Sequence, residues 1–164
     1  MKKLFLMLIL AFVSVYSFSL GIGVQLDLEP GISACSSETY FPCGIACSIK
    51  TDNYPVALGI CTDCDVTNGS LEAYVTADYW IFQHAVSNRG IFYTGAGVVA
   101  GTGLIRKSID FYAGPRAVIG LSWILYDGFL ETFVQTGCQA EFRTGWSDDI
   151  AVKFPVNTGI RFYY

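Results

Sequence analysis

The chain has 164 residues, of which 52% are hydrophobic and only 15% are charged, and its net charge is −4. This length suits a single domain, and the composition is more apolar than that of an ordinary soluble secreted domain. The sequence contains no basic patch interleaved with aromatic residues, which argues against a nucleic-acid partner.

The first 19 residues have the pattern of an export signal. Lys2 and Lys3 precede an unbroken apolar run over 4–13, and small serine residues follow. Ten apolar residues are too few to cross a bilayer as a helix, so we predict a cleaved secretory signal peptide over 1–19. The mature domain, 20–164, then has eight basic residues against fourteen acidic ones, a net charge of −6.

Segments of two-residue alternation follow the signal. In 20–29, aliphatic residues alternate with glycines and polar residues, which predicts a strand with one apolar and one polar face. Seven further strands are predicted by the same criterion: 41–50, 54–63, 70–82, 90–101, 109–122, 129–142 and 150–164. Residues typical of turns, such as Asn68 and Gly69, separate them.

The last segment, 150–164, alternates strictly over 15 residues. At about 3.3 Å per residue it reaches ~50 Å, which is enough to cross a bilayer even when tilted. An even number of strands lets the sheet close with both termini on one side, and closure leaves no strand edge exposed to hydrocarbon. We therefore predict an all-β fold, an eight-stranded antiparallel up-and-down transmembrane β-barrel. Aromatic residues cluster near the predicted strand ends, as in the girdles of membrane barrels.

One segment leaves an alternative open. Residues 90–105 are apolar and lie between Arg89 and Arg106, so a glycine-rich transmembrane helix is the main rival to a strand there. The five glycines of this segment and the alternation on either side of it favour the strand.

The alternation also predicts what fills the barrel. An eight-stranded barrel is just wide enough for side chains to occupy its interior. The inward face places Arg116 among the acidic residues Asp78, Glu72 and Glu131. Such a cluster forms either a narrow polar conduit or a plugged core whose charges pair with one another, and we favour the plugged core.

Five of the six cysteines lie between positions 35 and 64. Export implies an oxidising compartment, in which disulfides are the default. If the hairpin around 52–53 is tight, Cys43 lies near Cys61 at the outer rim. Four cysteines are therefore predicted to form a disulfide cap on the first two external loops, with a four-cysteine metal cluster as the second interpretation: Cys35, Cys43, Cys61 and Cys64.

Two other reactive residues carry no predicted chemistry. Cys138 is expected to face lipid as a small apolar side chain. The lone histidine, His84, falls in the predicted 83–90 turn, where no acidic residue could orient it, so we predict no catalytic role for it.

The chain ends on a polar residue, a glycine and two aromatic residues at Asn157, Gly159, Phe162 and Tyr164. This ending resembles the C-terminal assembly signal of bacterial outer-membrane β-barrels, which in that family is read by the barrel-insertion machinery. Together with the export signal, the eight alternating segments and the aromatic clusters, it makes the mature chain resemble the small eight-stranded outer-membrane barrels, the group of the OmpA transmembrane domain, OmpX and OmpW.

The resemblance implies a location in the cell outer membrane. The partners it implies are outer-membrane lipid, the barrel-assembly machinery and an external ligand or surface at the loops. We predict a non-enzymatic protein with a structural or surface-interaction role and a side-chain-filled lumen, without catalytic, cofactor or metal sites. The alternatives are a minor channel for small or apolar solutes and, less favoured, a lipid-modifying outer-membrane enzyme.

Overall fold

The computed structural model describes residues 20–33, 39–51, 54–66, 69–105, 108–144 and 149–164. The predicted signal peptide lies outside these ranges. The strands are β1 (Leu20–Leu28), β2 (Gly31–Ser33), β3 (Thr39–Tyr40), β4 (Cys43–Thr51), β5 (Val56–Asp65), β6 (Ser70–Ala85), β7 (Gly90–Ile105), β8 (Ser108–Leu125), β9 (Leu130–Thr144), β10 (Asp149–Lys153) and β11 (Val156–Tyr163). A short 3-10 turn, η1 (Tyr126–Gly128), joins β8 to β9.

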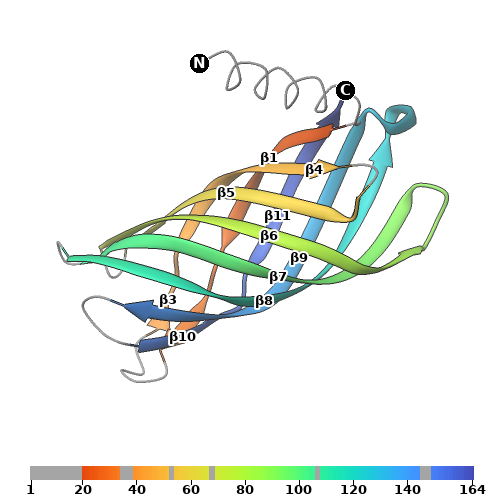
Figure 1. Ribbon diagram of the computed structural model, residues 1–164. Coiled ribbons are helices and arrows are strands. Elements are labelled where there is room, and N and C mark those ends of the chain that lie inside the picture. Colours follow the sequence, from red (N-terminus) through yellow and green to blue (C-terminus); the bar gives the residue numbers. More distant parts are fainter. Residues whose placement is uncertain (1–19, 34–38, 52–53, 67–68, 106–107, 145–148) are drawn as a thin grey trace, which may run out of the picture.

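These strands form one closed antiparallel barrel (Figure 1). Each strand pairs with its neighbour in the order β1-β4-β5-β6-β7-β8-β9, and β11 closes the ring because it pairs with both β9 and β1. Near the other end of the barrel, β10 lies between β9 and β2. The predicted eight-stranded antiparallel barrel is confirmed.

Three of the eight barrel strands are broken by a proline. Pro30 separates β1 from β2, Pro42 separates β3 from β4, and Pro155 separates β10 from β11. Proline has no N–H to donate to the ladder, so regular pairing stops there. Backbone bonds bridge the breaks, from the Glu29 N–H to the Pro42 carbonyl at 3.0 Å and from the Phe154 N–H to the Pro30 carbonyl at 2.7 Å. The single strand predicted over 150–164 is therefore two strands in one line.

Two other expectations meet the structure in this region of the chain. Residues 90–105 form strand β7, paired along its whole length with β8, so the transmembrane-helix alternative is wrong. Within the described ranges, no helix is long and apolar enough to cross a membrane. The turn predicted at 83–90 is shorter than expected, because β6 continues to Ala85 and the reversal occupies only 86–89.

The two faces of the barrel wall have opposite chemistry. Along β5 and over 70–81 of β6, buried residues alternate with more exposed ones. Most of the largest fully buried side chains are polar or charged, among them Arg161, Lys153, Gln139, Glu29 and Glu131. The exposed positions are aliphatic in the middle of the wall, as at Val24, Leu26, Ile45, Ile60 and Val75. The core of this molecule is therefore a polar lumen enclosed by an apolar outer surface.

Candidate functional site

The first feature of the lumen is an ion-pair network, here called the outer network, at the end of the barrel that carries β2 and β10. Lys153 Nζ lies 2.7 Å from Glu72 Oε2, 3.1 Å from Glu29 Oε2 and 3.1 Å from Glu141 Oε1. Arg143 Nη2 lies 2.8 Å from Glu72 Oε1 and 2.6 Å from Glu141 Oε2. These residues come from β6, β9, β10 and the β1–β2 break, so their ion pairs reach across the lumen.

Two tyrosines on β6 and β8 support this network. The Tyr112 hydroxyl donates to Glu72 at 3.2 Å, and the Tyr112 ring lies 4.6 Å below the Arg143 guanidinium. The Tyr74 hydroxyl lies 2.9 Å from Glu29 and 3.0 Å from Asp63. A phenol has one proton, so Tyr74 can donate to only one of these two carboxyl groups at a time.

A second group, here called the inner network, occupies the end of the barrel near the two chain termini of the described domain. Glu131 Oε1 lies 3.2 Å from Lys50 Nζ, Glu131 Oε2 lies 3.3 Å from Arg161 Nη1, and the Tyr163 hydroxyl also donates to Glu131. Lys50 Nζ lies 4.4 Å from the centre of the Trp80 ring. This indole stacks on a second lumen ring, that of Tyr93, with 3.7 Å between the centroids. The aromatic rings and the ion pairs together fill this end.

Between the two networks lies one more ion pair. Arg116 Nε is 3.0 Å from Asp78 Oδ1, and both side chains are buried. A gap beside this pair, lined by Gln25, Thr76 and other lumen residues, has a volume of about 10 Å³. A space of this size holds one water molecule at most.

The predicted lumen residues are all buried, but they do not form the single predicted cluster. Arg116 pairs with Asp78 as expected. Glu72 instead pairs with Arg143 and Lys153, whereas Glu131 belongs to the inner network. The prediction that both acids surround Arg116 is wrong, because they lie at different heights along the barrel axis and each is nearer to other cations.

Two cations that decide this arrangement were missing from the predicted cluster. Lys50 and Arg143 lie at the ends of predicted strands 41–50 and 129–142, the second one residue beyond the predicted end. Arg143 follows Glu141 at a spacing of two, so continuing the alternation one step would have placed it inside. The alternation thus indicated the inward position of Arg143, but the predicted strand ended one residue before it.

The residues of the predicted assembly signal lie on β11, apart from the terminal Tyr164. Asn157 is buried and its amide donates to Asp27. A Cβ on Gly159 would lie 2.5 Å from the Val24 carbonyl oxygen, so only glycine allows β11 to approach β1 this closely. The other end of the segment is aromatic, with Phe162 paired to Ile22 of β1 and the exposed Tyr164 beside it.

The cysteines are divided between the two faces of the wall. Cys43 and Cys64 are exposed and lie directly opposite each other in the β4–β5 ladder. Cys61 is buried in the lumen and lies opposite Ala46, not Cys43. The expected neighbourhood of Cys43 and Cys61 is therefore wrong, because the ladder stops at the Lys50–Ala57 pair, which makes the connection longer than a tight hairpin.

The rest of the predicted cap is less fully described. Cys35 lies outside the described residues. Among those that are described, no group of three or more histidine, cysteine or acidic side chains is arranged to hold a metal ion. Cys138 is exposed on the outer wall, as predicted. His84 is exposed on β6, where its ring stacks on Phe82, rather than in a turn.

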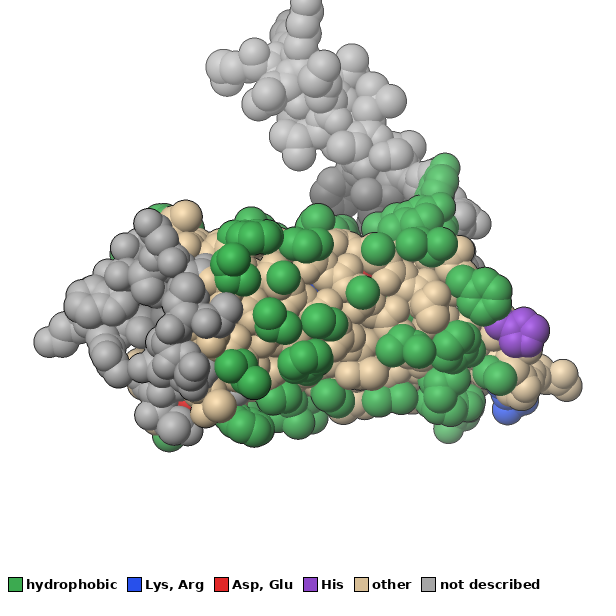
Figure 2. All heavy atoms as spheres, turned by 90° about the horizontal axis from the view of Figure 1, so that it is seen from below, with side chains coloured by type: hydrophobic (Ala, Val, Ile, Leu, Met, Phe, Trp, Pro, Cys, Tyr) green, Lys and Arg blue, Asp and Glu red, His purple; other side chains and the backbone are tan. Residues whose placement is uncertain are grey.

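The outer wall forms an apolar belt with an aromatic girdle at each end. In the view of Figure 2, green hydrophobic side chains are spread over the described wall, and charged side chains are nearly absent from it. One girdle, near the chain termini, includes several exposed aromatic residues: Tyr54, Tyr79, Phe82, Trp123, Tyr126, Phe129 and Tyr164. At the other end, the exposed aromatic side chains that the structure describes are phenylalanines: Phe41, Phe111, Phe142 and Phe154. Aromatic rings flanking an aliphatic belt are the pattern of a barrel wall that crosses a bilayer.

Comparison with known proteins supports the fold but not a closer relationship. No protein-family model matches the chain, and no curated protein sequence matches it. A solved structure, that of Neisserial surface protein A (NspA), superposes with a TM-score of 0.58 over 88% of this chain and 97% of that chain. The two sequences are 10% identical. The chain therefore shares the architecture of an eight-stranded outer-membrane barrel.

Proposed function

We propose that this chain is an integral outer-membrane protein with a structural or surface-interaction role and a closed lumen. The proposal extends to an export signal at 1–19, insertion by the barrel-assembly machinery and a location in the cell outer membrane. The apolar belt and the two girdles support the membrane location, as does the likeness to a surface protein of the same architecture.

The observation that carries the closed lumen is the stacking of three ionic layers along the barrel. The outer and inner networks each contain a buried ion pair that crosses the lumen, Lys153–Glu72 and Lys50–Glu131, and the buried Arg116–Asp78 pair lies between these two networks. Moving an ion past them would require breaking pairs that have no bulk water to replace them. The interior therefore supports the wall instead of conducting.

A minor channel is the competing function, and conductance separates the two. Purified full-length protein is inserted into a planar lipid bilayer, with a general porin as the positive control. We expect no steps above the bare-bilayer baseline across the accessible voltage range. Regular single-channel steps would overturn the closed lumen and favour the channel.

A lipid-modifying enzyme is the third candidate, and the described residues offer it little. The single histidine, His84, is exposed and stacks on Phe82, and no carboxylate of the described residues is bonded to it. Lipid A extracted from cells with and without the protein should have the same mass spectrum. A mass difference that depends on the protein would establish an enzymatic activity.

The cysteine pattern supports a covalent cap as a separate proposal. Cys43 and Cys64 are direct partners in the β4–β5 ladder, both are exposed, and Cys43 Sγ lies 3.8 Å from the Cys64 carbonyl oxygen. Their oxidation in an oxidising compartment would release two protons and pass two electrons to a disulfide oxidoreductase. Non-reducing peptide mapping of the exported protein should find a disulfide that joins segment 35–47 to segment 61–64. Recovery of all six cysteines as thiols would exclude the cap.

A further inference from the structure

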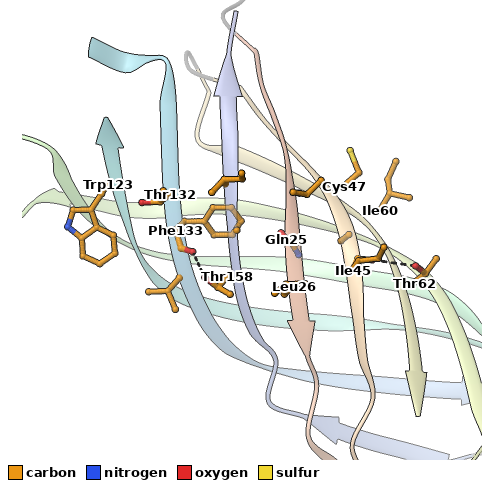
Figure 3. A pocket seen from close by; sticks show the side chains of 15 residues that line it. Gln25, Leu26, Ile45, Cys47, Ile60, Thr62, Trp123, Thr132, Phe133 and Thr158 are labelled. Carbon is orange, nitrogen blue, oxygen red and sulfur yellow. Dashed lines mark hydrogen bonds between the residues drawn. The ribbon is translucent and has the colours of Figure 1, made fainter. Parts of the chain in front are cut away.

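The outer wall is not uniformly convex, and one hollow in it has a regular construction. Two rows of outward side chains run across the strands, perpendicular to them (Figure 3). The first row leads from Trp123 on β8 through Ile160 and Val24 to Ile60 on β5. The second row lies two residues further along each strand and leads from Val134 through Leu26 to Thr62.

Between the two rows lies a trough, floored by the backbone of inward-facing residues such as Gln25 and Gly159. It crosses β8, β9, β11, β1, β4 and β5 and has a volume of about 870 Å³. With neighbouring strands about 4.8 Å apart, six strands make the trough ~24 Å long, and a two-residue step sets the centres of its two rows ~7 Å apart.

The lining of the trough is mostly apolar, and two of its three threonines, Thr158 and Thr62, bond their hydroxyl groups to the wall. The Thr158 hydroxyl donates to the Phe133 carbonyl at 3.2 Å, and the Thr62 hydroxyl donates to the Ile45 carbonyl at 3.4 Å. These hydroxyls are satisfied by the wall itself. The two threonines can therefore present their methyl groups to whatever fills the trough.

From these dimensions we infer that the trough is a binding site for one acyl chain of a membrane phospholipid. This inference depends on the membrane location proposed above, because the trough lies on the apolar outer wall and leads from Trp123, in the girdle near the chain termini, to the aliphatic belt at Ile60. Carbon atoms in contact are about 3.5–4.0 Å apart, so a hydrocarbon chain midway between rows whose centres are ~7 Å apart contacts both of them. A helix, which is about 10–12 Å across with its side chains, is too wide to enter.

Packing, and not the hydrophobic effect, selects this occupant. Lipid tails are as apolar as leucine, so an apolar wall in a bilayer gains nothing from burial alone. A chain on a convex wall touches protein on one side, whereas a chain in the trough touches the floor and both rows. The additional dispersion contacts make this phospholipid exchange more slowly than its neighbours on the rest of the wall.

The test counts phospholipids that stay bound. The full chain is reconstituted in vesicles of a dipalmitoyl phospholipid, extracted into mild detergent and measured by native mass spectrometry. Thr158→Phe fills the centre of the trough. Thr136→Phe is the matched control, because Thr136 faces outward on β9 but lies outside the trough.

The wild-type barrel and Thr136→Phe should each retain one phospholipid, and Thr158→Phe should lower that occupancy roughly tenfold. Faster gel migration of unheated samples checks that each variant is folded. If Thr158→Phe does not fold, Cys47→Leu takes its place, because the larger leucine side chain in the first row also narrows the trough. Equal occupancy in all variants, or no retained lipid in the wild type, would overturn the inference. A change of oligomeric state in Thr158→Phe would assign the trough to a second protein chain and also overturn it. Each of these three results would leave the proposed barrel function unaffected. Failure of the protein to enter vesicles would instead contradict the proposed function itself.

Discussion

On β6, Glu72 and Asp78 point into the barrel and form ion pairs, while Leu71 and Val75 on the same strand point outward and are exposed. The two faces of one strand thus solve opposite problems. Inside, stability depends on each charge finding a partner, because an unpaired buried charge is costly. Outside, it depends on the absence of charge, because the expected surroundings are hydrocarbon. This difference between the faces can be tested by removing a charge from the lumen and by placing a charge on the outer wall.

The largest effect is expected where β11 closes the barrel by pairing with β1 and β9, because inward and outward residues both contribute to the closure there. Deleting Phe162 to Tyr164 removes the pairing of Phe162 with both Ile22 and Leu130, and it removes the Tyr163 hydroxyl that donates to Glu131. We expect near-complete loss of assembled protein from the outer-membrane fraction, measured by immunoblotting of separated membranes. A soluble domain would lose little from a shortened terminus. Normal yields of folded, soluble protein would contradict the membrane account.

A single substitution inside the lumen should be the next most damaging. Glu131 is 0% exposed and is the shared partner of Lys50 and Arg161. Glu131→Gln leaves both cations without their carboxylate, which should cost about 3–5 kcal/mol of unfolding free energy in a urea titration. Thr132→Ala, on the next residue and the opposite face, should cost less than about 1 kcal/mol. Equal costs would mean that the lumen charges do not stabilise the barrel.

The reverse exchange places a charge on the outer face. Val75 is 52% exposed in the middle of the belt, and Val75→Arg should cost about 2–4 kcal/mol in lipid vesicles. Asn157→Arg is the inward control, because its guanidinium can pair with Asp27, whose Oδ2 has no hydrogen-bond partner. The arginine inside should be tolerated better than the arginine outside. If both variants lose the same stability, the two faces are not distinguished by the membrane.

The smallest effect comes from one substitution made on both faces. Cys138→Ser puts a hydroxyl on the outer wall and should cost about 0.5–2 kcal/mol. Cys61→Ser puts the same hydroxyl in the lumen, near acidic side chains that can accept its hydrogen bond, and should be close to neutral. Urea titrations of the two variants measure the difference. A larger loss for Cys61→Ser would reverse the assignment of the polar face.

The sequence predicts the faces well because their signal is local. A two-residue period is fixed by backbone geometry, so the inward positions of Asp78, Arg116 and Glu131 follow from counting along each strand. The closure of eight strands into a barrel follows from the number of alternating segments and from the need to pair the backbone groups at the strand edges.

The pairing between strands is less predictable because it depends on connection length. The ladder of β4 and β5 stops at Lys50 and Ala57, so the connection is longer than a tight hairpin. The register is shifted as a result, and Cys43 lies opposite Cys64 instead of near Cys61. It also sets which lumen charges share a height, so the division between Glu72 and Glu131 could not be read from their positions in sequence. The trough is harder still, since its two rows draw on β8, β9, β11, β1, β4 and β5.

The most direct test of the central claim is to measure the surroundings of successive residues on β6 in a lipid bilayer. Single spin labels are placed in turn at positions 71 to 78, and their collision rates with oxygen and with a water-soluble relaxing agent are recorded. The account predicts that oxygen, which concentrates in hydrocarbon, reaches the labels at Leu71, Ala73, Val75 and Ala77, and that the labels between them are reached by neither agent. Access of the water-soluble agent at Val75, or no alternation along the strand, would contradict it.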